Sequence, residues 1–135
     1  MGPVYLLDTS ALLTARDKEP GWERVAELLY AAWDGKTICL GCFITLMEVY
    51  YRVWKDENTL AGRSAYQGCL ALPIQWVHES PALLERAAML KATHRLSLAD
   101  AWIAAAALES EAILIHKDPE FESLESVAQE RLPYK

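Results

Sequence analysis

The sequence predicts an α/β fold with a central, mostly parallel sheet. Short apolar runs alternate along the chain with longer amphipathic segments, which is the pattern of successive β-α units. The chain has 135 residues, of which 53% are hydrophobic, so it can bury a continuous core without disulfides or a structural metal. It contains no repeat, low-complexity tract or linker, and we therefore predict a single domain over residues 1–135.

The expected elements follow one another in a regular order. Apolar runs predict strands at residues 4–7, 37–40, 73–77 and 112–115, and a weaker signal predicts an edge strand around Val127 in the tail 125–135. Apolar side chains at helical spacing predict helices over residues 22–33, 44–54, 59–70, 81–93 and 98–108. Asp34 and Gly35 are expected to end the first of these helices, and Ser80 and Ser97 to cap the last two.

Four carboxylates each lie where an apolar segment meets the start of a helix. Asp8 and Asp118 follow predicted strands, and they fall at the carboxyl edge of the sheet, where open α/β sheets bind ligands. Glu48 and Asp100 each stand three residues after a Thr or Ser, an arrangement that opens a helix. We expect the four side chains to converge on one pocket.

Helix capping explains any one of these acids by itself, because an acid is favoured at a helix N-terminus. It explains the set less well. Between Leu98 and Leu108 every residue except Asp100 is apolar, so this helix is expected to be buried, and an ionised group in it needs a compensating partner. A divalent cation would supply one, and carboxylate oxygens suit Mg²⁺.

Composition and cysteine content limit the classes of function. The formal charge of −6 argues against a broad nucleic-acid-binding surface, although it leaves room for a local basic rim. Three cysteines are an odd number, which suits a reducing compartment, and Cys39 and Cys42 lack the second ligand pair of a zinc site. Because no apolar stretch approaches a membrane span and no signal sequence is seen, we expect a cytoplasmic protein without a membrane partner.

Four segments resemble the acidic motifs of PIN-domain nucleases, in the order of that family. They are residues 6–10 (Leu-Leu-Asp-Thr-Ser), 45–51 (Thr-Leu-Met-Glu-Val-Tyr-Tyr), 97–101 (Ser-Leu-Ala-Asp-Ala) and 117–121 (Lys-Asp-Pro-Glu-Phe). The likeness is to VapC-type toxins of toxin–antitoxin pairs. It implies a PIN-like three-layer α/β/α sandwich and a Mg²⁺- or Mn²⁺-dependent endoribonuclease that hydrolyses RNA. It also implies a homodimer, a cognate antitoxin, and a role as the toxin of a type II toxin–antitoxin system.

The resemblance makes all four acids catalytic and metal-binding. We expect Asp8 and Asp100 to be direct ligands, and the other two acids to bind through water or to complete a second metal position. Ser10 and Thr9 would support the site as hydroxyl partners; alternatively, either one caps the following helix.

His116 departs from the family pattern, which often has Thr, Ser or Asn two residues before the last acid. An imidazole there could orient a group by donating a proton, weaken metal binding, or shift the pH dependence. Arg52 lies four residues after Glu48, so an ion pair along the helix is an alternative to an RNA contact. The residues considered for contacts to RNA phosphates are Arg16, Arg52, Arg95 and Lys117.

Two other functions stay open from the sequence. A haloacid-dehalogenase-like phosphatase also places an acid after its first strand, but Ser10 stands where its second acid would be. A catalytically inactive RNA-binding or interaction module could keep the same fold, because a fold alone does not guarantee chemistry.

Overall fold

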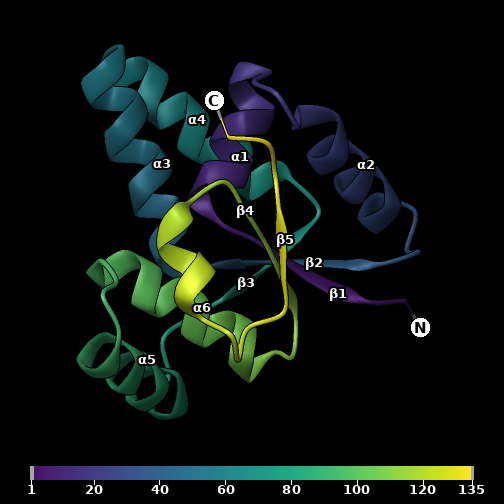
Figure 1. Cartoon of the computed structure of the whole chain (residues 1–135). Coiled ribbons are helices and arrows are strands. Elements are labelled where there is room, and N and C mark those ends of the chain that lie inside the picture. The colour runs from purple at the N-terminus through teal and green to yellow at the C-terminus, as the bar shows by residue number, and fades with distance from the viewer. Residues whose placement is uncertain (1, 135) are drawn as a thin grey trace.

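A computed structural model describes residues 2–134 as an α/β structure around one parallel sheet (Figure 1). The ends of the predicted domain, Met1 and Lys135, lie outside the described residues. The sheet has five strands in the order β3-β2-β1-β4-β5, and every neighbouring pair is parallel. The strands are β1 (Val4–Leu7), β2 (Ile38–Cys42), β3 (Ile74–Val77), β4 (Ile113–His116) and β5 (Gln129–Arg131).

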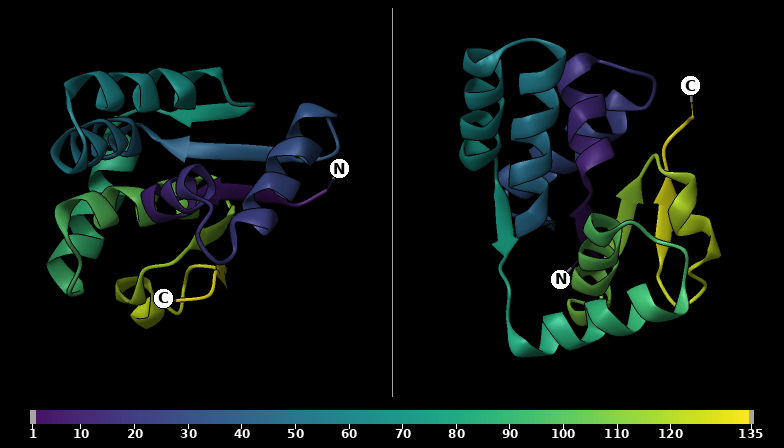
Figure 2. Two further views of the ribbon diagram at one scale, coloured as in Figure 1. Left: turned by 90° about the horizontal axis from the view of Figure 1, so that it is seen from above. Right: turned by 90° about the vertical axis from the view of Figure 1, so that its left-hand side faces the viewer.

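Helices cover both faces of the sheet because the strand side chains alternate between two hydrophobic clusters (Figure 2). Leu6 and Leu114 point into one cluster with α5, α6 and the 3₁₀ helix η1, and Leu7 and Ile115 point into the other with α1 to α4. The predicted three-layer sandwich is therefore confirmed. The helices are α1 (Thr9–Asp17), α2 (Trp22–Trp33), α3 (Phe43–Asp56), α4 (Thr59–Ala71), α5 (Pro81–Thr93), α6 (Leu98–Glu109) and η1 (Pro119–Ser123).

The strand order reverses between β1 and β4. From β1 the chain adds β2 and β3 on one side, and β4 and β5 lie on the other side. Ligands of open α/β sheets bind outside the carboxyl ends of the strands at such a switch point. The backbone N–H of Asp8, just after β1, donates to Ile115 O in β4 at 3.1 Å, which joins the two strand ends.

One predicted helix start is wrong. Thr45 does not open a helix, because β2 runs two residues further than predicted and leads directly into α3 at Phe43. Gly41 allows this extension, since a Cβ there would lie 2.4 Å from the ring of Trp76 on β3. Thr45 is fully buried inside α3 instead.

The helices α1 and η1 are not among the predicted helix ranges, and the remaining differences are shifts of element ends. β5 begins two residues after Val127, whose side chain is buried in the core below the sheet edge. The predicted caps Ser80 and Ser97 are confirmed, since their hydroxyls accept from the backbone N–H groups of Leu83 and Asp100.

Cys39, Cys42 and Cys69 are free and buried, as expected for thiols that serve as small core residues. Across residues 2–134, none of the helices has the length and apolar character needed to cross a bilayer.

Candidate active site

Asp8 lies directly after β1 and caps α1. Its carboxylate accepts from the backbone N–H of Ala11 at 2.7 Å and from the Ser10 hydroxyl at 2.7 and 2.8 Å. The Ser10 oxygen also accepts from the backbone N–H of Lys117 at 2.9 Å. The N-cap is therefore Asp8 rather than Ser10 or Thr9, and Ser10 ties the start of α1 to the end of β4.

Glu48 on α3 is held by the buried Thr9, which is also in contact with the buried Thr45. The Thr9 hydroxyl lies 2.6 Å from Glu48 Oε1 and 3.0 Å from Thr45 Oγ1. Because a carboxylate can only accept, Thr9 donates to Glu48. This contact directs the Glu48 side chain toward α1 and the residues that follow β1.

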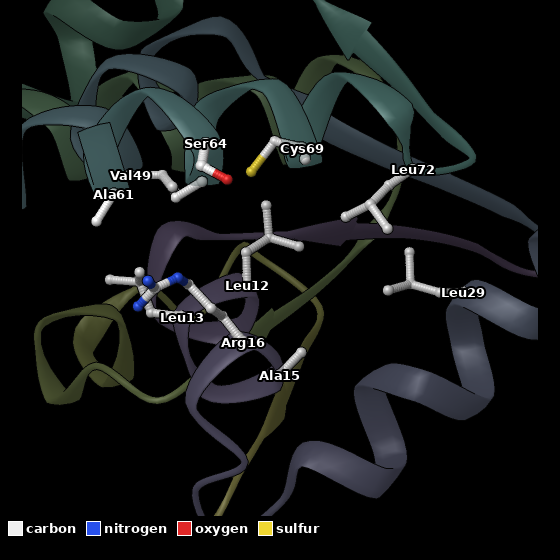
Figure 3. Close-up of a pocket in the computed structure, with 12 residues that line it drawn as sticks. Leu12, Leu13, Ala15, Arg16, Leu29, Val49, Ala61, Ser64, Cys69 and Leu72 are labelled. Carbon is white, nitrogen blue, oxygen red and sulfur yellow. The ribbon is translucent and has the colours of Figure 1, made fainter. Parts of the chain in front are cut away.

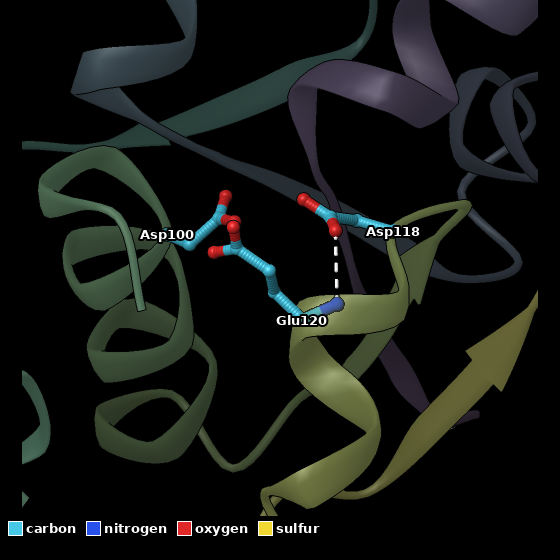
Figure 4. A group of neighbouring side chains, drawn as sticks. All are labelled: Asp100, Asp118 and Glu120. Atoms are coloured by element: carbon cyan, nitrogen blue, oxygen red, sulfur yellow. Dashed lines mark hydrogen bonds between the residues drawn. The ribbon is translucent and has the colours of Figure 1, made fainter. Parts of the chain in front are cut away.

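Asp100, Asp118 and Glu120 form a tight group of carboxylates (Figure 4). Each offers an oxygen within 4.8 Å of the others. Asp100 lies in the first turn of α6, whereas Asp118 caps η1 by accepting from the backbone N–H of Glu120 at 2.9 Å. Glu120 Oε1 also accepts from the backbone N–H of Ser97 at 3.0 Å, which links η1 to the start of α6.

Glu120 was not predicted as a site residue. The sequence signal for it was its position two residues after Asp118, in a turn that begins with Pro119. The four predicted acids and Glu120 all line one cavity of about 380 Å³ at the carboxyl edge of the sheet. In the structure the acids converge on one cavity, as predicted. The carboxylates closest to one another are those of Asp100 in α6 and of Asp118 and Glu120 at η1.

The cavity brings together acidic groups whose ionised forms are disfavoured by burial and by one another. Asp8 and Asp100 are only 2% and 8% exposed. Burial raises the pKa of Asp8 to about 7, and the charges of Asp118 and Glu48 act in the same direction. Burial, followed by the adjacent carboxylate of Asp118, also raises the pKa of Asp100.

None of the five carboxylates has a Lys or Arg ion-pair partner within residues 2–134. Several acids held in a partly buried cavity without a cation repel one another. Carboxylate oxygens are the donors that Mg²⁺ and Mn²⁺ prefer. The residues present therefore fit a divalent cation.

Of the four predicted basic residues, Arg52 and Lys117 line the cavity. The alternative ion pair between Arg52 and Glu48 does not occur among the ion pairs of residues 2–134. Arg95 is exposed on the loop before α6 and does not line the cavity. Arg52 is thus the residue of this group best placed to meet an anion at the site.

Lys117 and Arg16 are engaged elsewhere. The Lys117 ammonium donates to the carbonyl of Pro20 at 2.8 Å, and its side chain is only 9% exposed. Arg16 pairs with Asp17 and Glu57, each at 2.9 Å, and lies in a neighbouring groove. Both side chains are thus held by contacts within the protein.

His116 is fully buried at the end of β4. Its Nδ1 accepts from the backbone N–H of Asp118 at 3.0 Å, and its Nε2 lies 2.9 Å from Gln129 Oε1. Burial lowers the pKa of the imidazole, which favours the neutral form. Of the roles considered for His116, the structure therefore shows a ring that meets the Asp118 amide as an acceptor rather than as a proton donor.

A second, apolar cavity of about 540 Å³ lies between α1, α2, α3 and α4 (Figure 3). Leu12, Leu29 and Leu72 line it, and Arg16 lies at its edge. The sequence did not predict this cavity. Arg16 also lines the charged groove beside it, and that groove shares Arg52 with the acidic cavity, so neighbouring cavities have lining residues in common.

Comparisons with known proteins agree with this geometry. The family model of the PIN domain matches residues 5–126, and the chain belongs to that family. Comparison with the sequences of curated proteins gives no match. The prediction made from the four acidic motifs is thus confirmed at the level of the family.

Solved structures with the same fold include components of toxin–antitoxin pairs. VapBC2 from Rickettsia felis, bound to a promoter DNA fragment, matches with a TM-score of 0.77 and 20% identity, over 96% of this chain and 99% of that chain. A toxin–antitoxin complex from Klebsiella pneumoniae matches with a TM-score of 0.63 and 25% identity, over 92% and 95%. VapC20 of Mycobacterium tuberculosis, a sarcin-ricin-loop-cleaving toxin, matches with a TM-score of 0.70 and 17% identity, over 90% and 95%.

Proposed function

We propose that this protein is a divalent-metal-dependent endoribonuclease and the toxin of a type II toxin–antitoxin pair. The observation that carries the proposal is the convergence of five carboxylates on one cavity at the sheet's switch point, none of which has a Lys or Arg ion-pair partner among residues 2–134. Membership of the PIN family supports it, as does the similarity to toxins such as VapC20.

The carboxylates of Asp8, Asp100, Asp118 and Glu120 would hold the ion, and Glu48 would complete the site from α3. A bound Mg²⁺ or Mn²⁺ would activate water, polarise the phosphate and neutralise charge as the P–O bond breaks.

The protein's own contribution is orientation. Ser10 holds the Asp8 carboxylate by hydrogen bonds of 2.7 and 2.8 Å, and Thr9 holds Glu48 by one of 2.6 Å. Arg52 at the cavity wall would contact a phosphate of the RNA, as a cation does in most nucleic-acid contacts.

The partners that fit these surfaces are RNA, an antitoxin and a second copy of the chain. An inhibitor covering the acidic cavity should carry Arg or Lys. An antitoxin segment long enough to cover the acidic cavity would also reach the apolar cavity, because the groove that borders the apolar cavity at Arg16 borders the acidic cavity at Arg52. A homodimer would cover part of the exposed apolar surface, to which Tyr30, Trp33 and Leu98 contribute.

The test is RNA cleavage by purified protein in Mg²⁺ or Mn²⁺, in EDTA, and in EDTA followed by excess metal. We expect cleavage with metal, loss in EDTA, recovery on addition of metal, and no cleavage by Asp100→Asn. Glu109→Gln at the exposed end of the same helix is the matched control and should stay active. Cleavage that continues in EDTA, or full activity of Asp100→Asn, would contradict the proposal.

The alternatives have distinct outcomes in the same assay. A protein that neither binds Mn²⁺ nor cuts RNA would be an inactive RNA-binding or interaction module. Release of phosphate from small phosphomonoesters, with RNA left intact, would indicate a phosphatase.

A further inference from the structure

We propose that His116 and Gln129 are positioning residues, which fix the turn carrying Asp118 and Glu120 through one chain of hydrogen bonds that starts on β5. The proposal rests on the proposed function, in which two carboxylates of this turn, those of Asp118 and Glu120, would hold the metal. Neither residue lines the acidic cavity, so their effect would be indirect.

The first link joins His116 to the backbone of Asp118. His116 Nδ1 accepts from the N–H two residues further along the chain at 3.0 Å, the same i to i+2 pattern that Asn and Asp side chains make in turns. The contact fixes where β4 ends and where η1 begins. Asp118 Oδ1 in turn accepts from the backbone N–H of Glu120 at 2.9 Å. The contact from His116 therefore also helps to position the carboxylates of Asp118 and Glu120.

The second link joins His116 to β5. His116 Nε2 lies 2.9 Å from Gln129 Oε1, and Gln129 Nε2 donates to the carbonyls of Phe121 and Leu124 at 2.7 and 2.9 Å. Since those two carbonyls require the amide nitrogen, the amide oxygen must face His116. His116 therefore carries its proton on Nε2 and leaves Nδ1 free to accept.

In this chain of hydrogen bonds each donor meets an acceptor: the Asp118 amide donates to His116 Nδ1, His116 Nε2 donates to Gln129 Oε1, and Gln129 Nε2 donates to two backbone carbonyls. Gln129 holds η1 from its end, through the carbonyls of Phe121 and Leu124, while His116 holds it from its start. The ring of Phe121 packs edge-on against the imidazole, with centroids 5.1 Å apart. The turn is thus fixed at both ends by residues that do not touch the cavity.

The turn requires this support because of the charges it carries. Asp118 and Glu120 offer oxygens within 4.8 Å of Asp100, and like charges at this separation repel when no cation is present. A turn free to relax would separate the carboxylates and lose the arrangement needed for an ion. Partners that orient metal ligands typically contribute 10- to 100-fold to metal affinity.

The experiment uses four variants of the full chain. His116→Leu removes both links, Gln129→Met removes the link to β5, and His116→Asn keeps an acceptor for the Asp118 amide. Glu130→Gln is the matched control, because Glu130 is the next residue on β5 and pairs with Arg24 on α2.

Two measurements are made on the wild type and the variants. In metal-free protein, NMR gives the hydrogen exchange rate of the Asp118 amide in every protein, and the imidazole tautomer of His116 where the histidine is retained. Calorimetry then gives the affinity for Mn²⁺. The first measurement needs no metal, so it tests the positioning role even if the proposed function fails.

We expect the wild type to have a protected Asp118 amide and the Nε2-protonated tautomer of His116. His116→Leu should expose the amide to exchange and weaken Mn²⁺ binding about 10- to 100-fold, and Gln129→Met should weaken Mn²⁺ binding about tenfold. His116→Asn should keep the amide protected and bind Mn²⁺ more tightly than His116→Leu does. Glu130→Gln should match the wild type. If His116→Leu fails to fold, the comparison of Gln129→Met with Glu130→Gln decides.

Equal Asp118 exchange in the wild type and in His116→Leu, or Mn²⁺ affinity in Gln129→Met equal to that of the wild type, would overturn the positioning role. A wild type with a protected amide and no affinity for Mn²⁺ would refute the metal-dependent function while leaving the hydrogen-bond chain supported.

Discussion

Asp8→Asn should stabilise the metal-free protein, and the gain should increase with pH. Asp8 is 2% exposed, and its carboxylate lies in a cavity with four other acids. An asparagine keeps an oxygen for the Ala11 N–H, so the helix cap survives. The substitution removes the buried negative charge and one of the two oxygens that accept from Ser10.

The magnitude follows from the raised pKa of Asp8, from 3.8 to about 7. Between these values the folded protein holds a proton that the unfolded chain has lost, so the free energy of unfolding falls as pH rises through this window. The full shift of ~3 units corresponds to about 4 kcal/mol. From about pH 5 to about pH 8, the stability difference between Asp8→Asn and the wild type should grow by ~2–3 kcal/mol.

Urea denaturation in EDTA at several pH values measures this difference directly. Asp34→Asn is the control, since it removes an exposed carboxylate at the end of α2. Adding Mn²⁺ should reverse the order, because the ion stabilises the wild type and has lost a ligand in Asp8→Asn. A difference that does not change with pH, or an Asp8→Asn variant that is less stable at about pH 8, would refute the reasoning.

Three further variants test individual contacts. Glu120→Gln keeps the oxygen that accepts from Ser97 but loses a ligand charge, so Mn²⁺ affinity by calorimetry should fall about 10-fold or more. Thr9→Val leaves Glu48 without its donor; cleavage should fall about tenfold and unfolding should cost about 1–2 kcal/mol less. Lys117→Met removes a charged donor from a backbone carbonyl, so urea titrations should show a loss of about 1–2 kcal/mol while RNA affinity in fluorescence anisotropy stays unchanged.

The order of strands and helices was predictable because hydrophobic periodicity is a local property. Runs such as residues 4–7 and 112–115 carry their own signal, and the parallel arrangement follows from the helices between them. Their carboxyl ends had to meet at one edge, so Asp8 and Asp118 could be placed together. The arrangement of a Thr or Ser three residues before an acid, which opens helices, then added Glu48 and Asp100, and the family resemblance supported all four.

The contacts that sequence reasoning missed depend on pairing between distant segments. Thr45 has the pattern of a helix start, but the pairing of β2 with β3 extends the strand and moves the start to Phe43. Lys117 looked available to RNA, yet it meets the Pro20 carbonyl 97 residues earlier in the chain. Neither contact has a signal in its own neighbourhood.

The role of His116 could not be predicted for the same reason. Its partner Gln129 is 13 residues away, and only the register of β4 with β5 brings the two side chains together. Glu120 differs, because it lies within the acidic segment at residues 117–121. Its position gives no distinct signal of a metal ligand, since an acid early in a helix is common without a metal.

The most direct test of a divalent cation held by these carboxylates is a crystal soaked in Mn²⁺ and measured for anomalous scattering. We predict a peak in the acidic cavity, bounded by the carboxylates of Asp8, Asp100, Asp118 and Glu120, and its absence in crystals of Asp100→Asn soaked in parallel. A wild-type cavity without a peak, or a peak of equal height in Asp100→Asn, would contradict the account.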